Sequence, residues 1–203
     1  MVQIKIINKK TIFEFYYMKR CFDFTMALII MMIVVLPIAV IAVLVRITSP
    51  GPAIYWSDRV GRDNKNFLMP KFRTMHSGSP EMATHLLQNA DNYLTPFGSF
   101  LRRTSLDELP QLWSVLKGDM SFVGPRPALF NQGDLIKLRT KKGISVLTPG
   151  ITGWAQINGR DDISIPVKVS YEEYYLKNKS FFFDLKILWN TFFKVIRKEG
   201  VAH

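Results

Sequence analysis

The sequence predicts a mainly helical α+β fold with a small β-hairpin, and three features of the chain support this prediction. An apolar run lies near the N-terminus, an amphipathic helical pattern lies near the C-terminus, and two strand-like stretches flank a turn between them. A chain of 203 residues is long enough for one domain with a hydrophobic core. We therefore expect an N-terminal membrane segment, residues 1–50, and a compact soluble part, residues 51–203, that together form one integrated domain.

The apolar run ALIIMMIVVLPIAVIAVLV, residues 27–45, contains no polar side chain in 19 positions. This is close to the ~20 residues that a helix needs to cross a hydrocarbon core of ~30 Å. Pro37 leaves ten residues of the run before it and eight after it, and a proline inside a helix removes a hydrogen bond and kinks the helix. A straight span and a re-entrant helix that turns at Pro37 both fit the run. A secretory signal peptide fits poorly, because the run is long and no A-x-A-like cleavage site follows it.

The charges beside the run do not favour one side of a membrane. Four basic residues precede it and four follow it: Lys9, Lys10, Lys19 and Arg20, then Arg46, Arg59, Arg62 and Lys65. A spanning helix usually carries its excess of lysine and arginine on the cytoplasmic side. The balance is expected if both ends stay in the cytoplasm, which favours re-entrance, whereas hydropathy alone favours the span.

Two strand-like stretches, Ala53–Trp56 and Phe67–Met75, flank the turn-favouring sequence RVGRDNKN and predict a β-hairpin. In the second strand Lys71 and Arg73 are two residues apart, so their side chains lie on one face. Such a pair could bind phosphate or could form the solvated face of the strand. After the hairpin, residues 81–90 have a pattern compatible with a helix.

Residues 106–117 predict an amphipathic helix. Ser105 and Glu108 have the spacing of a capping box at its start, and Gly118 is a typical helix stop. The predicted buried face consists of Leu109, Leu112, Trp113 and Leu116.

Asp107 and Glu108 lie side by side in the first turn of this predicted helix and allow two interpretations. Acidic side chains in a first turn stabilise the helix dipole without any chemistry. Alternatively, the helix end binds phosphate and keeps Asp107 ionised, so that one carboxylate serves as a nucleophile and the other binds a divalent cation. Arg126, between two prolines, lies in stiff backbone that would hold its guanidinium ready for a bidentate phosphate contact.

Near the C-terminus, FFFDLKILWNTFFKVIRK, residues 181–198, predicts an amphipathic helix. Its apolar face carries Leu185, Leu188, Trp189, Phe192 and Ile196, and its other faces carry Lys186, Asn190, Lys194 and Arg197. An aromatic face opposite lysines is typical of a helix in the headgroup region of a membrane. A helix that packs its apolar face on a protein core is the alternative.

The charge balance of the chain predicts an anionic partner. The sequence has 27 lysines and arginines against 16 acidic residues, a net charge of +11. Nucleic acid, a lipid headgroup surface and a phosphorylated substrate are the partner classes that fit. Cys21 is the only cysteine and the three histidines are scattered, so the sequence indicates no intramolecular disulfide and no recognisable zinc site, and we expect a reducing compartment.

The order of four motifs resembles the bacterial sugar transferases, the monotopic phosphoglycosyl transferases that begin lipid-linked glycan assembly. The motifs are KFRTM (71–75), FLRRTSLDELPQLWSVLKGDMSFVGPRP (100–127), PGITGWAQINGR (149–160) and DLKIL (184–188), and with the apolar run they cover nearly the whole chain. The resemblance implies transfer of a sugar 1-phosphate from a UDP-sugar to polyprenyl (undecaprenyl) phosphate, with release of UMP. It also implies the first membrane step of glycoconjugate synthesis (O-antigen, capsule, exopolysaccharide or glycoprotein glycan), carried out on the cytoplasmic face of the bacterial inner membrane.

The resemblance also implies roles for individual residues. A covalent phosphosugar intermediate would form on Asp107, with Glu108 as its partner, and both carboxylates would hold Mg²⁺. Substrate phosphate would be bound by Lys71, Arg103 and Arg126, and the re-entrant helix would break at Pro37. The implied partners are the donor, the acceptor and membrane lipids, a homodimer is compatible with the family, and nucleic acid is not expected.

Three positions depart from the pattern of many relatives. Leu36 precedes Pro37 where a serine often helps to satisfy freed backbone groups. Thr148 replaces a basic residue before PGITG, and Glu172 replaces an aspartate before the Tyr-Tyr pair. We assign no binding role to Thr148 or Glu172.

Two alternatives belong to other classes. A membrane-anchored basic protein that binds anionic lipid or nucleic acid explains the charge, but not an adjacent Asp-Glu pair, which would repel a phosphate backbone. A nucleotide-sugar glycosyltransferase would form a glycosidic bond, but the sequence lacks a convincing alternating βαβ pattern. Release of UMP indicates phosphosugar transfer, and release of UDP indicates the glycosyltransferase.

Overall fold

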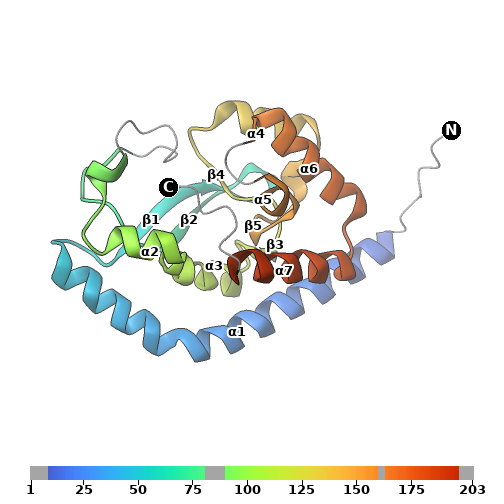
Figure 1. Cartoon of the computed structure of the whole chain (residues 1–203). Coiled ribbons are helices and arrows are strands. Elements are labelled where there is room, and N and C mark those ends of the chain that lie inside the picture. The colour runs from blue at the N-terminus through green and yellow to red at the C-terminus, as the bar shows by residue number, and fades with distance from the viewer. Residues whose placement is uncertain (1–8, 81–89, 160–162, 197–203) are drawn as a thin grey trace.

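The computed structural model describes residues 9–80, 90–159 and 163–196. A long helix, α1 (Lys9–Thr48), runs along one side of a compact part built from shorter helices and two small sheets (Figure 1). The predicted fold class, mainly helical with a small sheet, is confirmed.

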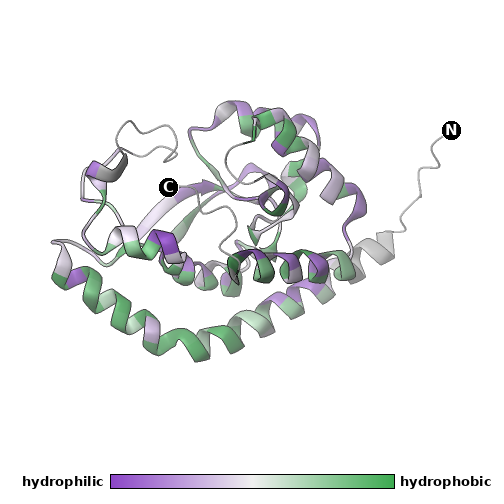
Figure 2. Cartoon of the chain, viewed as in Figure 1, coloured by the Kyte–Doolittle hydropathy of each residue, from purple (hydrophilic) through white to green (hydrophobic). Residues whose placement is uncertain are grey.

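Helix α1 is continuous through Pro37, and Figure 1 shows that it bends along its length. The proline removes one backbone hydrogen bond, but helix is present on both sides of it, so the predicted break at Pro37 is not confirmed. Within α1, Tyr16–Thr48 is long and apolar enough to cross a membrane. Figure 2 shows the apolar middle of the helix, where exposed side chains include Met32, Ile33, Leu36, Val40 and Val43. An exposed apolar face of this length supports membrane association.

The predicted hairpin is confirmed. Strand β1 (Ile54–Val60) pairs antiparallel with β2 (Asn66–Phe72), with Tyr55 opposite Lys71, and a short 3₁₀ turn, η1 (Arg62–Asn64), joins them. Strand β4 (Ala128–Leu129) adds to the other edge of β1, which gives the order β2-β1-β4. A second sheet pairs β3 (Ser121–Val123) in parallel with β5 (Gly150–Thr152).

The remaining elements are short except for the last two helices. In chain order they are η3 (Ala90–Tyr93), α2 (Gly98–Thr104), η4 (Leu106–Gln111), α3 (Leu112–Lys117), α4 (Gly133–Lys141), η5 (Ile144–Val146), α5 (Trp154–Gly159), α6 (Ile165–Asn178) and α7 (Phe181–Ile196). The helix predicted over residues 81–90 lies outside the described residues but for its last position, Ala90, which begins η3.

The predicted helix over residues 106–117 is wrong in its first half. Residues of η4 form a 3₁₀-helix that contains Pro110, whose ring would clash with the Leu106 carbonyl in an α-helix. Ser105 has a left-handed backbone (φ 56°) and its side chain makes no capping hydrogen bond, so the predicted capping box is also wrong. The predicted stop is confirmed, since Gly118 ends α3 with φ 95°.

The late start of α3 also changes which side chains it buries. The short helix turns Leu112 and Val115 into the protein, where they are 4% and 0% exposed. Trp113, predicted to be buried, is 53% exposed. An aromatic side chain therefore faces outward five residues after the Asp-Glu pair.

Helix α7 is amphipathic as predicted. Ile187 is fully buried and Leu188 packs on the core beside it. The opposite face exposes Leu185, Trp189 and Phe192, of which Trp189 is 64% exposed. Exposed aromatic side chains over most of a helix favour the interfacial interpretation over a core-facing one.

Both arms of α1 pack on the same compact part. Before Pro37, Ala27 lies in a cluster with Leu112, Val115, Met69 and Met120. After Pro37, Ile41 and Val45 lie in a second cluster with Phe72 and Leu101. Both ends of the apolar run therefore pack against the same compact part of the protein.

Candidate active site

The Asp-Glu pair lies where η4 packs against the end of β2. Lys71 Nζ donates to Glu108 Oε1 at 2.9 Å, and Arg126 Nη2 donates to the same oxygen at 3.1 Å. Lys71 comes from the hairpin and Arg126 from the loop after β3, so the fold brings together three segments that are distant in sequence. Asp107 is 8% exposed beside them. Of the predicted residues, Lys71, Asp107, Glu108 and Arg126 are brought together.

Opposing effects set the charge of the two carboxyl groups. Burial alone would raise the pKa of Glu108, but the charges and hydrogen bonds of Lys71 and Arg126 hold it far below its usual range. The pKa of Asp107 is raised, mainly by burial, and the negative charge of Glu108 adds to this effect. Burial outweighs the neighbouring cations in its effect on the pKa of Asp107, and the expectation that Asp107 is ionised stays a prediction.

Arg102 is a site residue that the sequence interpretation missed. Its Nε donates to Thr74 Oγ1 at 2.9 Å, and its charge acts directly on Asp107. Burial lowers the pKa of Arg102, and Asp107 opposes that effect. Arg103, the predicted neighbour, is exposed on α2, and its phosphate-binding role stays a prediction. Adjacent helical positions point about 100° apart, so Arg102 and Arg103 face different directions.

Arg73 does not join the site. It lies just after β2, and its Nη2 and Nη1 donate to the carbonyl oxygens of Ser49 and Pro50 at 2.8 Å and 2.5 Å. Arg73 is therefore a structural residue that fixes the end of α1 to the hairpin. The possibility that Lys71 and Arg73 grip one phosphate together is wrong.

The two carboxylates of the pair suit a hard divalent cation that takes its other ligands from a substrate and water. Across the described ranges, no group of three or more His, Cys, Asp or Glu side chains lies close enough to hold a metal ion. Asp107 and Glu108 supply two carboxylates, and both contacts of Glu108 with its cations fall on Oε1. Mg²⁺ is commonly held by one or two carboxylates together with substrate phosphates and water, so these residues fit Mg²⁺ in the presence of a phosphorylated ligand.

Comparison with known proteins gives a consistent picture. The family described as "Bacterial sugar transferase" matches residues 14–198. The chain is 42% identical to "Uncharacterized sugar transferase EpsL" of Bacillus subtilis over 186 residues, which covers 91% of this chain and 90% of that protein. It is 36% identical to the "UDP-galactose-lipid carrier transferase" of Erwinia amylovora over 200 residues. It is 39% identical to the "UDP-glucose:undecaprenyl-phosphate glucose-1-phosphate transferase" of Escherichia coli over 190 residues.

The matched regions differ in how much of each relative they cover. The comparisons with the Erwinia and Escherichia proteins cover 91% and 87% of this chain but only 41% and 40% of those proteins. The chain thus spans about two-fifths of these two longer relatives, and nearly the whole of EpsL.

Proposed function

The chain belongs to the bacterial sugar transferase family and is a transferase, and from this premise we propose that it transfers a sugar 1-phosphate from a UDP-sugar to undecaprenyl phosphate. UMP is the second product. This reaction would be the first membrane step in the synthesis of a glycoconjugate. The observation that carries the proposal is the buried Asp107 beside Glu108, with Lys71, Arg102 and Arg126 around them.

The proposed chemistry proceeds in two displacements at one phosphorus atom. The carboxylate of Asp107 attacks the phosphorus that bears the sugar, and the bond from this phosphorus to the bridging oxygen breaks, so UMP departs with that oxygen. The sugar phosphate is then covalently attached to Asp107 as an acyl phosphate. A phosphate oxygen of undecaprenyl phosphate attacks the same phosphorus and frees the Asp107 carboxylate.

The surroundings of Asp107 support this role. Its carboxyl is shielded from water, which raises its basicity and makes the ionised form a better nucleophile. Three cations lie around the pair, and their charges suit the negative charge that a diphosphate brings. Glu108, held ionised between Lys71 and Arg126, keeps two of these cations at a fixed place.

We propose Mg²⁺ as the cofactor, with Asp107 and Glu108 as the residues that would hold it together with the donor diphosphate. When bound, the ion would reduce the charge repulsion between the carboxylates and the diphosphate. Lys71 and Arg126 would remain the fixed cations of the protein itself.

The direct test of the proposed function is the identity of the released nucleotide. Purified protein in detergent is incubated with undecaprenyl phosphate and each member of a panel of UDP-sugars, and the nucleotide is identified by chromatography. UMP from one donor supports phosphosugar transfer. Release of UDP would identify a glycosyltransferase. Release of no nucleotide from any donor would favour a protein that binds anions without catalysis.

We also propose that α1 is re-entrant and that both of its ends lie in the cytoplasm. Two features support this arrangement. Residues on both sides of Pro37 pack on one soluble body, which a straight span could not achieve with both of its ends. The apolar side chains that face away from that body are the ones available to lipid. The catalytic part would then lie on the cytoplasmic face of the inner membrane, with the aromatic face of α7 at its surface.

Cysteine labelling tests this topology. Cys21 is exposed and is first replaced by serine, after which single cysteines are introduced in place of Lys10 and Lys65. In inside-out vesicles a membrane-impermeant maleimide should label both positions, and in intact spheroplasts it should label neither. Labelling of the two positions from opposite sides would show that α1 spans the membrane, and the re-entrant arrangement would be wrong.

Arg126→Lys tests how the cluster recognises phosphate. The substitution keeps the charge but replaces a planar fork of donors by a point charge, so bidentate contacts are lost. We expect kcat/KM for UMP release to fall about tenfold to a hundredfold, the equivalent of losing a charge-assisted hydrogen bond of ~1.5–3 kcal/mol. Lys117→Arg, at an exposed lysine that pairs with Asp119, is the matched control and should leave turnover unchanged. Normal kinetics in Arg126→Lys would reduce Arg126 to a structural partner of Glu108.

A further inference from the structure

One turn of α1 contacts two elements that adjoin the candidate active site in the chain: α3, which follows η4, and β3, which precedes the loop of Arg126. Arg20 Nη1 donates to the Val115 carbonyl at 2.5 Å, and Nη2 donates to the Leu116 carbonyl at 2.6 Å. Both carbonyls lie in the last turn of α3, and the Val115 carbonyl also accepts a hydrogen bond from the Gly118 N–H that ends the helix. Because α3 follows η4 without a gap, Arg20 contacts the far end of a continuous segment, residues 106–117, that carries Asp107 and Glu108 near its start.

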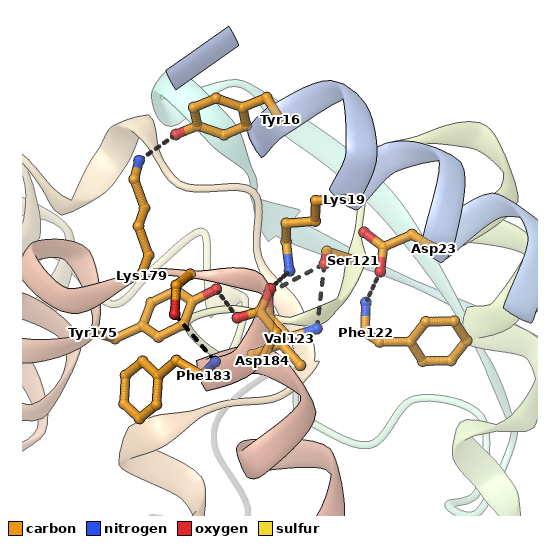
Figure 3. A network of polar contacts seen from close by, with 11 residues as sticks. Tyr16, Lys19, Asp23, Ser121, Phe122, Val123, Tyr175, Lys179, Phe183 and Asp184 are labelled. Carbon is orange, nitrogen blue, oxygen red and sulfur yellow. Dashed lines mark hydrogen bonds and ion pairs between the residues drawn. The ribbon is translucent and has the colours of Figure 1, made fainter. Parts of the chain in front are cut away.

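Asp23, three residues later on α1, contacts β3, the strand that precedes the loop of Arg126. It is 4% exposed, and its Oδ1 accepts a hydrogen bond from the Phe122 backbone N–H at 3.2 Å (Figure 3). Phe122 is the middle residue of β3, whose neighbours pair with β5 on the other side. An amide on the open edge of a strand needs a partner, which Asp23 supplies. Four residues after Phe122 the chain reaches Arg126.

Two other polar residues of α1 before Pro37, Tyr16 and Lys19, contact parts of the chain that do not carry the site. Lys19 forms an ion pair with Asp184 of α7, and Tyr175 Oη donates to the same carboxylate at 2.7 Å. Lys179 Nζ donates to Tyr16 Oη at 2.8 Å. Figure 3 shows these contacts beside Asp23, on the same arm of α1. These contacts fix the N-terminal part of α1 to α7 and to the connection between α6 and α7. Arg20 and Asp23 instead contact α3 and β3.

We propose that Arg20 and Asp23 are positioning residues that set the separation between the carboxylate pair on η4 and the guanidinium of Arg126. This inference rests on the proposed function. Glu108 and Arg126 meet at 3.1 Å, and the same turn of α1 contacts α3, which directly follows η4, and β3, which lies just before the loop of Arg126. A displacement of about 1 Å between reacting groups and their supports can lower a rate substantially. In this proposal, α1 aligns the carboxylate pair on η4 with the guanidinium of Arg126.

Asp23→Ala and Asp23→Asn test the contact with β3. Alanine removes the acceptor of the Phe122 amide, and we expect kcat for UMP release to fall about tenfold, with the donor KM changed by less than about twofold. The amide oxygen of asparagine accepts the same hydrogen bond, so Asp23→Asn should restore turnover. Tyr16→Phe removes a hydrogen bond of α1 outside the site elements and should have no effect on kcat.

A double-mutant cycle separates positioning from a general loss of stability. In an Arg126→Lys background, Asp23→Ala should lower kcat by less than about threefold, because the guanidinium that Asp23 positions is already gone. Arg20→Gln in the same background gives a second cycle with the same expectation. Losses that are fully additive in both cycles, or an equal loss in Tyr16→Phe, would overturn the inference.

Amide hydrogen exchange gives a readout that does not depend on turnover. Asp23→Ala should increase exchange in a peptide covering residues 121–126, whereas Asp23→Asn and Tyr16→Phe should not. If Asp23→Ala does not give folded protein, Arg20→Gln is judged in the same way on residues 112–118. Unchanged exchange would overturn the inference even with normal UMP release. A wild-type protein that releases no UMP would count against the proposed function, while the exchange data would still decide the positioning role.

Discussion

Asp107→Asn is expected to abolish UMP release, with a loss of at least about a thousandfold, while the protein stays folded. Asparagine has the shape of aspartate but no charge with which to attack phosphorus. Since burial already opposes ionisation of Asp107, a neutral side chain is tolerated there, and the thermal unfolding midpoint should stay within a few degrees of the wild-type value. The measurement is UMP release by each variant in detergent, together with a thermal unfolding curve.

A matched substitution controls for the general effect of removing a carboxylate. Asp134 is exposed in the first turn of α4, away from the pair, and Asp134→Asn should retain wild-type turnover. An Asp107→Asn enzyme with normal turnover would show that the pair has only a structural role in η4. Loss of both turnover and folding would indicate that Asp107 is needed for the fold, and Asp107→Ser would then be compared at a lower temperature.

Removal of divalent cations is the second change with a large expected effect. We expect EDTA to lower UMP release at least about a hundredfold and added Mg²⁺ to restore it, because in the proposed mechanism two carboxylates and a diphosphate would share one site. The fold should not depend on the ion, since no three-ligand cluster lies within the described ranges. Thermal unfolding without donor should therefore be the same with and without EDTA.

Glu108→Gln connects this effect to the site. Glutamine is a poorer metal ligand and also loses the charge that pairs with Lys71 and Arg126, so the Mg²⁺ concentration for half-maximal rate should rise. Glu173 makes comparable contacts with Lys142 and Lys177 on the outer helices, and Glu173→Gln should leave the Mg²⁺ dependence unchanged. Full UMP release in EDTA would remove Mg²⁺ from the proposed mechanism.

Local sequence patterns predicted those parts of the fold that short-range physics determines. The hairpin follows from two strand-like stretches around Gly61 and Asp63, and the latter adopts a left-handed backbone (φ 55°) in the turn. Helix α7 follows from its apolar period, and the end of α3 follows from Gly118. In each case a few neighbouring residues specify the structure without help from distant ones.

The parts that were not predicted depend on tertiary contacts or on one competing residue. Pro110 converts the start of the predicted helix at 106–117 into a 3₁₀ turn, although the apolar pattern continues through it. The sequence does not specify which of Arg102 and Arg103 faces Asp107, because that depends on where α2 begins and how it packs. Arg73 looks like a phosphate ligand in sequence, but the end of α1 supplies its carbonyl partners.

The central claim is that Asp107 is the nucleophile, and mass spectrometry of the protein incubated with donor alone tests it most directly. The protein is exposed to each UDP-sugar without undecaprenyl phosphate, quenched in acid and digested. The account predicts a peptide that contains Asp107 and carries the added mass of one sugar phosphate, which disappears when undecaprenyl phosphate is added before quenching. An adduct mapped to another residue, or UMP release in the presence of the acceptor with no adduct at any time, would contradict it.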